Sequence, residues 1–240
     1  MDDITPTPAD GERPDPLPAF AELALIVVAD PPQESLRRIA ELAKQTVGGV
    51  EDVSLTVLER GRPRSVVFTG PLAVDLDERQ YEAGFGPCLD AARSGQTIVV
   101  DSQQDDTPYL EFARVASRAG VRQTVSVGMP LAQRSIGGMN IYRTADTPLT
   151  SAVLEHTRLF AGYAAVAVAN ILSYADAANE VTHLRIAMES RAVIEQAKGI
   201  IMVRDHCTAD EAYHLLTRIS QQQNVKLRVL AQSIVDAAHE

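Results

Sequence analysis

No proline interrupts the chain between Thr150 and about Arg204, and alanine is frequent through the middle of this stretch. A helix of that length exceeds the usual helix of a globular domain and is typical of a coiled-coil connector. We therefore predict a linker helix over residues 173–190 and a homodimer formed through the helix around residues 150–190. The heptads are too irregular to give a register. The apolar positions of this helix are Leu159, Tyr163, Val166, Ile171, Val181, Leu184 and Met188.

The C-terminal sixty residues have the pattern of three helices on short connections. In the segment Arg191–Arg204, apolar side chains recur at spacings of three and four, as they do on one face of a helix. Thr208, followed three residues later by Glu211, predicts a capping box at the start of the next helix. The apolar stripes of the last two helices are Ala212, Leu215, Leu216 and Ile219, and then Leu227, Leu230, Ala231, Ile234 and Val235.

Three short motifs in this region carry a resemblance to a known family. They are Ile194-Glu-Gln-Ala-Lys-Gly-Ile-Ile-Met202, then Ala212-Tyr213, Leu215-Leu216 and Ser220, and finally Asn224-Val-Lys-Leu227. Residues 181–240 therefore resemble the ANTAR domain, a small three-helix module that binds RNA and regulates transcription termination. The chain departs from the pattern at Gln221-Gln222, where many relatives carry a more basic or apolar mixture.

The resemblance implies a set of RNA-binding residues. Asn224 and the run Gln221–Gln223 are expected to read bases that are splayed out of RNA loops. Gly199 would allow close approach of RNA to the backbone, or else tight packing between helices. Glu195 is placed to neutralise either Arg191 or Lys198. The expected phosphate and loop contacts are Arg191, Lys198, Arg204, Arg218, Lys226 and Arg228.

The charge distribution agrees with this interpretation but does not name RNA by itself. The net charge is −10, and all of it lies in residues 1–180, while residues 181–240 hold seven basic and seven acidic side chains. Between Ala212 and Val235 there are three cations and no acidic residue. A polyanion would be repelled by residues 1–180 but could bind to residues 181–240. A neutral amphipathic bundle with a solvated charged face is the alternative explanation.

The region before the long helix has an α+β pattern. Residues 1–16 form a tail rich in proline, aspartate and threonine, which we expect to be disordered. Helices are predicted over Leu17–Val28 and Gln33–Val47, and shorter ones near 75–83, 87–94 and 107–119. Strands are predicted at 53–57, 65–68, 97–100, 124–129 and 136–142, two pairs of which form hairpins. Short strands in hairpins with helices between them favour a mainly antiparallel sheet.

Within this region, several segments carry a second resemblance. They are Gly86-Pro-Cys-Leu-Asp90, Gln96–Asp101, Phe112, Gly120-Val121, Ser126–Leu131 and Gly137–Tyr142. They are similar to the GAF domain, and more narrowly to the subtype often fused in front of ANTAR modules in actinobacterial regulators. We assign residues 17–172 to this sensor domain and 181–240 to the ANTAR domain. The family implies helices on one side of the sheet and a cavity on the other, which is used to sense small molecules or to dimerise.

Candidate ligand-binding residues in the sensor domain are Phe85, Cys88, Asp101, Tyr109 and Phe112. Cys88 follows Gly-Pro near a predicted helix start, where the pKa of a thiol can be lowered, although a small packed side chain is the more common reading. Core packing is the default for the aromatic residues, and a solvated loop is the default for Asp101. No metal-ligand spacing, cofactor fingerprint or catalytic constellation is visible, so we expect a protein that is not an enzyme and holds no cofactor.

The sequence thus predicts a cytoplasmic, dimeric, signal-responsive regulator that binds paired RNA hairpins and prevents formation of a terminator. No apolar stretch approaches the length of a membrane span, and the N-terminus lacks the pattern of a signal peptide. Two other classes stay open. The protein could bind duplex DNA through the same helices, or it could be a ligand-sensing dimer that signals through protein contacts alone.

Overall fold

A five-stranded antiparallel sheet organises the N-terminal part of this computed structural model, which describes residues 17–59, 62–132, 134–147 and 149–238. The strand order is β2-β1-β5-β4-β3, and every neighbouring pair is antiparallel. This confirms the α+β assignment and both hairpins. The strands are β1 (Val50–Glu59), β2 (Arg62–Phe68), β3 (Thr97–Asp101), β4 (Gln123–Leu131) and β5 (Arg134–Arg143).

Eight helices accompany these strands in the described part of the chain. The first is shorter than expected, because the chain leaves the helix at Ala24 and runs through turns into the prolines at 31 and 32. The predicted tail at residues 1–16 lies outside the described residues. The helices are α1 (Leu17–Ala24), α2 (Pro32–Thr46), α3 (Pro71–Ala83), α4 (Pro87–Ser94), α5 (Leu110–Arg118), α6 (Ser151–Asp205), α7 (Ala209–Gln223) and α8 (Leu227–Ala237).

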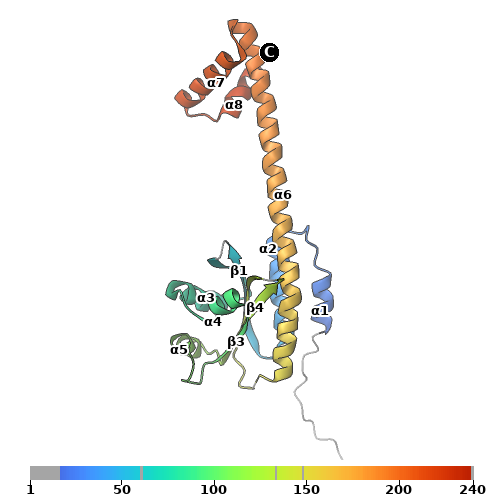
Figure 1. Ribbon diagram of the computed structural model, residues 1–240, viewed down its shortest axis with the longest axis vertical. Helices are drawn as coiled ribbons and strands as arrows, with labels where there is room; N and C mark the ends of the chain where they lie inside the picture. The colour runs from blue at the N-terminus through green and yellow to red at the C-terminus, as the bar shows by residue number, and fades with distance from the viewer. Residues whose placement is uncertain (1–16, 60–61, 133, 148, 239–240) are drawn as a thin grey trace, which may run out of the picture. The chain divides into compact units, whose positions relative to one another are not determined.

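The chain divides into two compact units, which meet within α6 at Ala175 and Asp176. In the first unit, α2 and the early turns of α6 cover one face of the sheet, while α3 and α4 lie on the other (Figure 1). In the second unit, the last turns of α6 pack with α7 and α8 around their own apolar core. Each unit therefore has a separate core.

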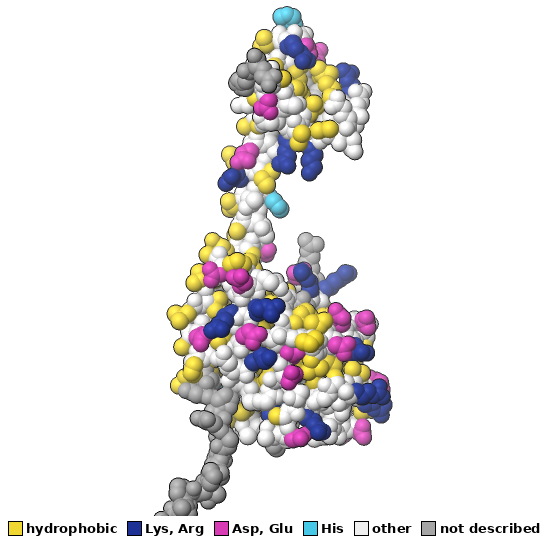
Figure 2. Space-filling view, turned by 180° about the vertical axis from the view of Figure 1, so that it is seen from behind, with side chains coloured by type: hydrophobic (Ala, Val, Ile, Leu, Met, Phe, Trp, Pro, Cys, Tyr) yellow, Lys and Arg dark blue, Asp and Glu magenta, His cyan; other side chains and the backbone are white. Residues whose placement is uncertain are grey.

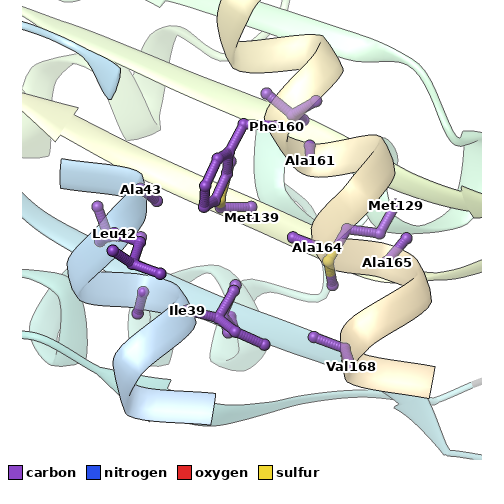
Figure 3. Packing of buried hydrophobic residues seen from close by; sticks show 14 of the residues in the cluster. Ile39, Leu42, Ala43, Met129, Met139, Phe160, Ala161, Ala164, Ala165 and Val168 are labelled. Atoms are coloured by element: carbon purple, nitrogen blue, oxygen red, sulfur yellow. The ribbon is translucent and has the colours of Figure 1, made fainter. Parts of the chain in front are cut away.

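The alanines of α6 let this helix pack closely in the first core. Ala161, Ala164 and Ala165 are buried together with Phe160 and face the side chains of α2 over the sheet (Figure 3). Small side chains are needed where a helix approaches its neighbours closely, because interiors are packed almost without voids. Of the seven apolar positions predicted for the long helix, only Ile171 is buried. The side chains at the other six positions are exposed.

The face of the sheet opposite α2 carries polar side chains and is covered by α3 and α4. Strand β1 is buried from Asp52 to Val57 on both faces, because helices cover both sides. Ser54 and Thr56 point away from the apolar core and toward α3 and α4. The expectation of helices on one side and a cavity on the other is therefore wrong in detail, since α3 and α4 close over this face.

The second unit follows the sequence prediction closely. The Thr208 hydroxyl accepts from the Glu211 amide at 3.3 Å, and the Glu211 carboxylate accepts from the Thr208 amide at 2.8 Å, which completes the predicted capping box. Helix α7 ends at Asn224, whose left-handed backbone (φ 53°) closes the helix C-terminus. The buried core residues of the unit are Ala197, Ile201, Ala212, Leu216, Ala231 and Val235.

Helix α6 also bears on the question of membranes. We expected no membrane-spanning stretch, yet by length and composition α6 is long and apolar enough to cross a bilayer, with a mean hydropathy of 1.3 over 18 residues. A third of that window is buried inside the protein. Core helices pass the same criterion, so this is weak evidence for a span.

Candidate nucleic-acid interface and ligand site

The predicted RNA-binding residues fall on all three helices of the second unit. Arg191, Lys198, Gly199 and Arg204 lie on α6, and Arg218 lies on α7. The turn between α7 and α8 brings together the remaining three, since Asn224 ends α7, Lys226 is the N-cap of α8 and Arg228 lies in its first turn. Figure 2 shows Lys and Arg side chains spread over the surface of this unit.

Two of these cations are neutralised within the helix that carries them. The Lys198 ammonium lies 2.9 Å from the Glu195 carboxylate, and its side chain is only 16 % exposed. Of the two partners that the sequence offered Glu195, the structure therefore selects Lys198. The Arg204 guanidinium donates two hydrogen bonds to Asp205, which holds the pKa of that carboxyl below its usual value. Both cations must exchange a partner before they contact a phosphate.

The other cations form no ion pair within the described part of the chain. These are Arg191, Arg218, Lys226 and Arg228, all on exposed positions. Arg218 lines a hollow of about 450 Å³ along α7 with His214 and Gln221. Arg228 lines a groove of about 490 Å³ between α6 and α8. Unpaired guanidinium groups are suited to bind phosphate, but both hollows also have acidic lining residues, Glu211 in the first and Glu189 and Asp236 in the second.

Gly199 and Asn224 are distinguished by their backbone surroundings. A Cβ added to Gly199 would meet nothing within 4 Å, so tight packing between helices does not explain this glycine. Asn224, by contrast, has a structural reason to be there. Its left-handed conformation suits asparagine and glycine, and its amide closes α7 onto the Ser220 and Gln221 carbonyls. Its side chain is exposed.

In the first unit, a buried polar cluster occupies the sheet face under α3 and α4. Ser126, Asn140 and Ser54 form one row across β4, β5 and β1. The Asn140 amide donates to the Ser54 hydroxyl at 2.9 Å and to the Cys88 sulfur at 2.9 Å. Tyr142, on the same face of β5, donates its hydroxyl hydrogen to Asp77 on α3. This cluster was missed at the sequence level, although the alternation of Ser54 and Thr56 with valine and leucine was its signal.

Several atoms of this cluster have no hydrogen-bond partner in the described part of the protein. They are the Asn140 Oδ1, the Ser126 Oγ and the Thr124 Oγ1, and all three residues are fully buried. Buried polar groups in folded proteins are almost always paired, so three unpaired atoms on adjacent strands are an unusual feature of this sheet face.

Cys88 belongs to this cluster, and its side chain is fully buried. Burial, followed by the charge of Asp77, raises the pKa of Cys88 to about 12. The possibility of a lowered pKa at the helix start is therefore wrong, because desolvation outweighs any effect of the helix end. The packed side chain is confirmed, but its neighbours are polar. Its sulfur also lies 3.3 Å from the Thr56 hydroxyl.

Three of the other predicted ligand residues come together in a pocket between α3 and α5. Phe85, Tyr109 and Phe112 all line this cavity of about 600 Å³. Cys88 is not among the lining residues, and neither is Asp101. The Asp101 carboxylate instead accepts hydrogen bonds from the Gln103 amide and the Gln104 side chain, which is a local turn. The predicted ligand set is therefore divided among three places. No group of three possible metal ligands occurs in the described ranges.

Comparison with known proteins supplies the family. Residues 29–169 match the family model described as GAF domain, and residues 182–235 match the model described as ANTAR domain. No curated protein matches the chain.

Solved structures resemble the first unit at low identity. A GAF domain/HD domain protein from Geobacter sulfurreducens is 16% identical, covers 60% of this chain and 95% of its own, and has a TM-score of 0.46. The N-acylhomoserine lactone-dependent LuxR family factor CepR2 from Burkholderia cenocepacia is 17% identical over 63% and 92%, with a TM-score of 0.49. The reduced form of fRMsr of Staphylococcus aureus is 18% identical over 63% and 93%, with a TM-score of 0.47.

Proposed function

This chain belongs to the GAF domain family and carries an ANTAR domain behind its GAF domain, and from that architecture we propose that it binds RNA hairpins and prevents transcription termination in response to a signal. The two domains together are those of a signal-sensing regulator. In the proposed mechanism, the ANTAR domain holds an antiterminator hairpin, the competing terminator does not form, and polymerase continues. The protein acts in the cytoplasm, where nascent RNA is available.

The observation that carries this proposal is the set of unpaired cations on α7 and α8. Arg218, Lys226 and Arg228 lie in a segment without any acidic residue from Ala212 to Val235, and none of them forms an ion pair in the described structure. Each is free to contact a phosphate without first losing a partner. Asn224 and the run Gln221–Gln223, exposed at the same turn, supply amide groups for bases that are splayed from a loop.

The α6 residues form a second part of the same interface. Arg191 is unpaired in the described structure, and Gly199 leaves open space through which a sugar–phosphate backbone can approach the helix. Lys198 and Arg204 contribute after exchanging Glu195 and Asp205 for phosphate. The exchange costs little at Arg204, whose ion pair is at the surface, and more at Lys198, whose side chain is largely covered.

The GAF domain supplies the response to the signal. The polar cluster around Asn140 and the pocket lined by Phe85, Tyr109 and Phe112 are its two candidate binding places for a small molecule. Cys88 belongs to the polar cluster and follows Phe85 closely in the chain, and its thiol is buried and stays protonated. Asp101 belongs to neither of these two places, so we do not propose it as a ligand-binding residue.

A homodimer is part of the proposal. Leu159, Tyr163 and Val166 are exposed on the first half of α6, and Val181, Leu184 and Met188 are exposed on the second. So many exposed apolar side chains on one helix favour burial against a second copy. Two linked ANTAR domains would bind a pair of hairpins more tightly than one, because the second hairpin is held at high effective concentration. A ligand then acts by binding one arrangement of the two chains better than the other.

The test compares full-length protein on three nucleic acids of related sequence: a paired hairpin RNA, a single hairpin RNA and a duplex DNA. Titration at several salt concentrations is expected to give tightest binding to the paired hairpins, with an affinity that falls steeply with salt. Preference for duplex DNA would instead support a DNA-binding regulator. Binding to none of the three would support a sensing dimer that signals through protein contacts.

A further inference from the structure

We propose that the pocket between α3 and α5 binds a flat aromatic compound that carries no phosphate or other anionic group. The inference rests on the proposed function, because it names the class of signal that the GAF domain senses. It concerns a cavity separate from the polar sheet face, since no strand residue lines it.

The pocket has the size and lining of a small-molecule site. Its volume is about 600 Å³, within the range of ~300–1,000 Å³ that is usual for such sites. Helix α3 and the following turn form one wall, and the start of α5 forms the other. The apolar lining residues are Ala83, Phe85, Pro108, Leu110, Phe112 and Val115.

A stacked aromatic pair sets the shape of the ligand. The rings of Phe85 and Tyr109 are 5.2 Å apart between centroids and inclined by 25°. Phe85 is half exposed, so this apolar ring still has free surface at the pocket. Offset stacking is favourable between flat rings, and a planar ligand would extend the existing pair.

Tyr109 is held in place from outside the pocket. Its hydroxyl donates to the Asp90 carboxylate at 2.9 Å, and Asp90 belongs to α4. Burial, and then this hydrogen bond, raises the pKa of Tyr109 to about 12, so the phenol stays neutral. The ring therefore presents a fixed, uncharged face, which lowers the cost of ordering a side chain when a ligand binds.

The charges at the pocket disfavour an anion. Its charged lining residues are Arg79, Glu82 and Glu111. Arg79 is paired with Asp75 at 3.2 Å and Glu111 with Arg114 at 3.3 Å, which leaves Glu82 as the charged lining residue without an ion pair in the described structure. The partial positive charge at the start of α5 is met by Glu111 in its own first turn. A nucleotide or other phosphate would find no free cation here, whereas a neutral or cationic ring is compatible.

Gln80 connects the pocket to the rest of the domain. It is buried at the pocket wall, and its Oε1 accepts from the Cys88 amide at 2.9 Å. A Cβ on Gly86 would overlap the Gln80 amide, so this turn is built around that contact. A ligand that stacks on Phe85 would therefore lie beside the turn that leads into α4, where Cys88 enters the polar cluster.

The test uses nucleic-acid-free, full-length protein and three compounds that separate shape from charge. Proflavine is a flat tricyclic cation, acridine-9-carboxylate is an anion on the same type of ring system, and adamantylamine is a compact cation that is not flat. Proflavine binding is followed by fluorescence anisotropy, and the other two serve as competitors. We expect each competitor to bind at least about tenfold more weakly than proflavine.

Two variants locate the binding. Phe85→Leu keeps an apolar side chain but removes the stacked ring, and should weaken proflavine binding about tenfold. Tyr213→Leu removes an exposed ring on α7, which does not line the pocket, and should leave binding unchanged. Equal binding by Phe85→Leu and wild type would overturn the assignment, as would an anionic competitor that matches proflavine.

Hairpin RNA binding, measured in parallel without proflavine, keeps the two proposals apart. A protein that binds paired hairpins but not proflavine overturns the pocket assignment and leaves the proposed function standing. A protein that binds proflavine through Phe85 but binds no hairpin supports the pocket and overturns the proposed function.

Discussion

The Glu195 carboxylate lies 2.9 Å from the Lys198 ammonium, one helical turn away on α6. This pair withdraws a cation from the face that is proposed to meet RNA. The ion pair with Glu195 therefore decides how much Lys198 contributes to the proposed RNA binding.

Glu195→Gln is expected to raise the affinity for paired hairpins about two- to fivefold, because it releases Lys198 from an ion pair near the surface, and such pairs are worth up to ~1 kcal/mol. Filter binding or anisotropy with labelled RNA measures the change. Asp210→Asn is the matched control, since it removes one negative charge elsewhere in the same unit and should give a smaller gain. Equal gains from both variants would show that only net charge matters.

Arg218→Ala should weaken hairpin binding and lower the slope of log affinity against log salt by about one, since one phosphate contact is lost. Arg228→Ala should behave alike, and Lys198→Ala should weaken binding less because its charge is already compensated. Arg185→Ala is the control, because Arg185 is paired with Glu189 and lies outside the proposed interface. Wild-type slopes for both Arg218→Ala and Arg228→Ala would mean that this face does not contact RNA.

Cys88→Ser is expected to leave hairpin binding nearly unchanged, while changing how stability depends on pH. The folded protein keeps the thiol proton up to about pH 12, whereas an unfolded thiol loses it near 9.0. Because the folded pKa is raised, this contribution to stability is complete below pH 9 and decreases as the pH rises toward 12.

Urea unfolding at pH 8 and pH 10 measures this difference. Wild type should lose about 1 kcal/mol more than Cys88→Ser over that interval, since the serine hydroxyl does not titrate. Tyrosine titration affects both proteins alike and cancels in the comparison. Parallel losses, or an oxidant response that disappears in Cys88→Ser, would contradict a protonated and inert thiol.

The double variant Leu184→Glu/Met188→Glu should yield monomers, because it places like charges in an apolar seam. Sedimentation gives the mass, and the advantage of paired over single hairpins should disappear with the dimer. The control is Asn179→Glu/Thr182→Glu, which adds the same charge to exposed positions on the opposite side of the helix. A monomeric wild type that binds paired and single hairpins equally would rule out the dimer.

Local patterns in the sequence were sufficient for most elements of the fold. The capping box of Thr208 and Glu211 involves residues three apart, and its geometry follows from the helix itself. The hairpins and the apolar faces of α2, α7 and α8 follow from periods of two and 3.6. These features depend on neighbours along the chain, and such neighbours are visible in the sequence.

Only the tertiary structure decided which residues act together. The sequence grouped Phe85 with Cys88 and Asp101, but strand register and the placement of α3 and α4 put Cys88 against Asn140, 52 positions away. The same long-range packing buried the hydroxyls of Ser54 and Ser126 and raised the pKa of Cys88 by desolvation. Burial and hydrogen bonding across distant segments depend on how the elements pack, and a residue pattern read along the chain contains no direct record of that packing.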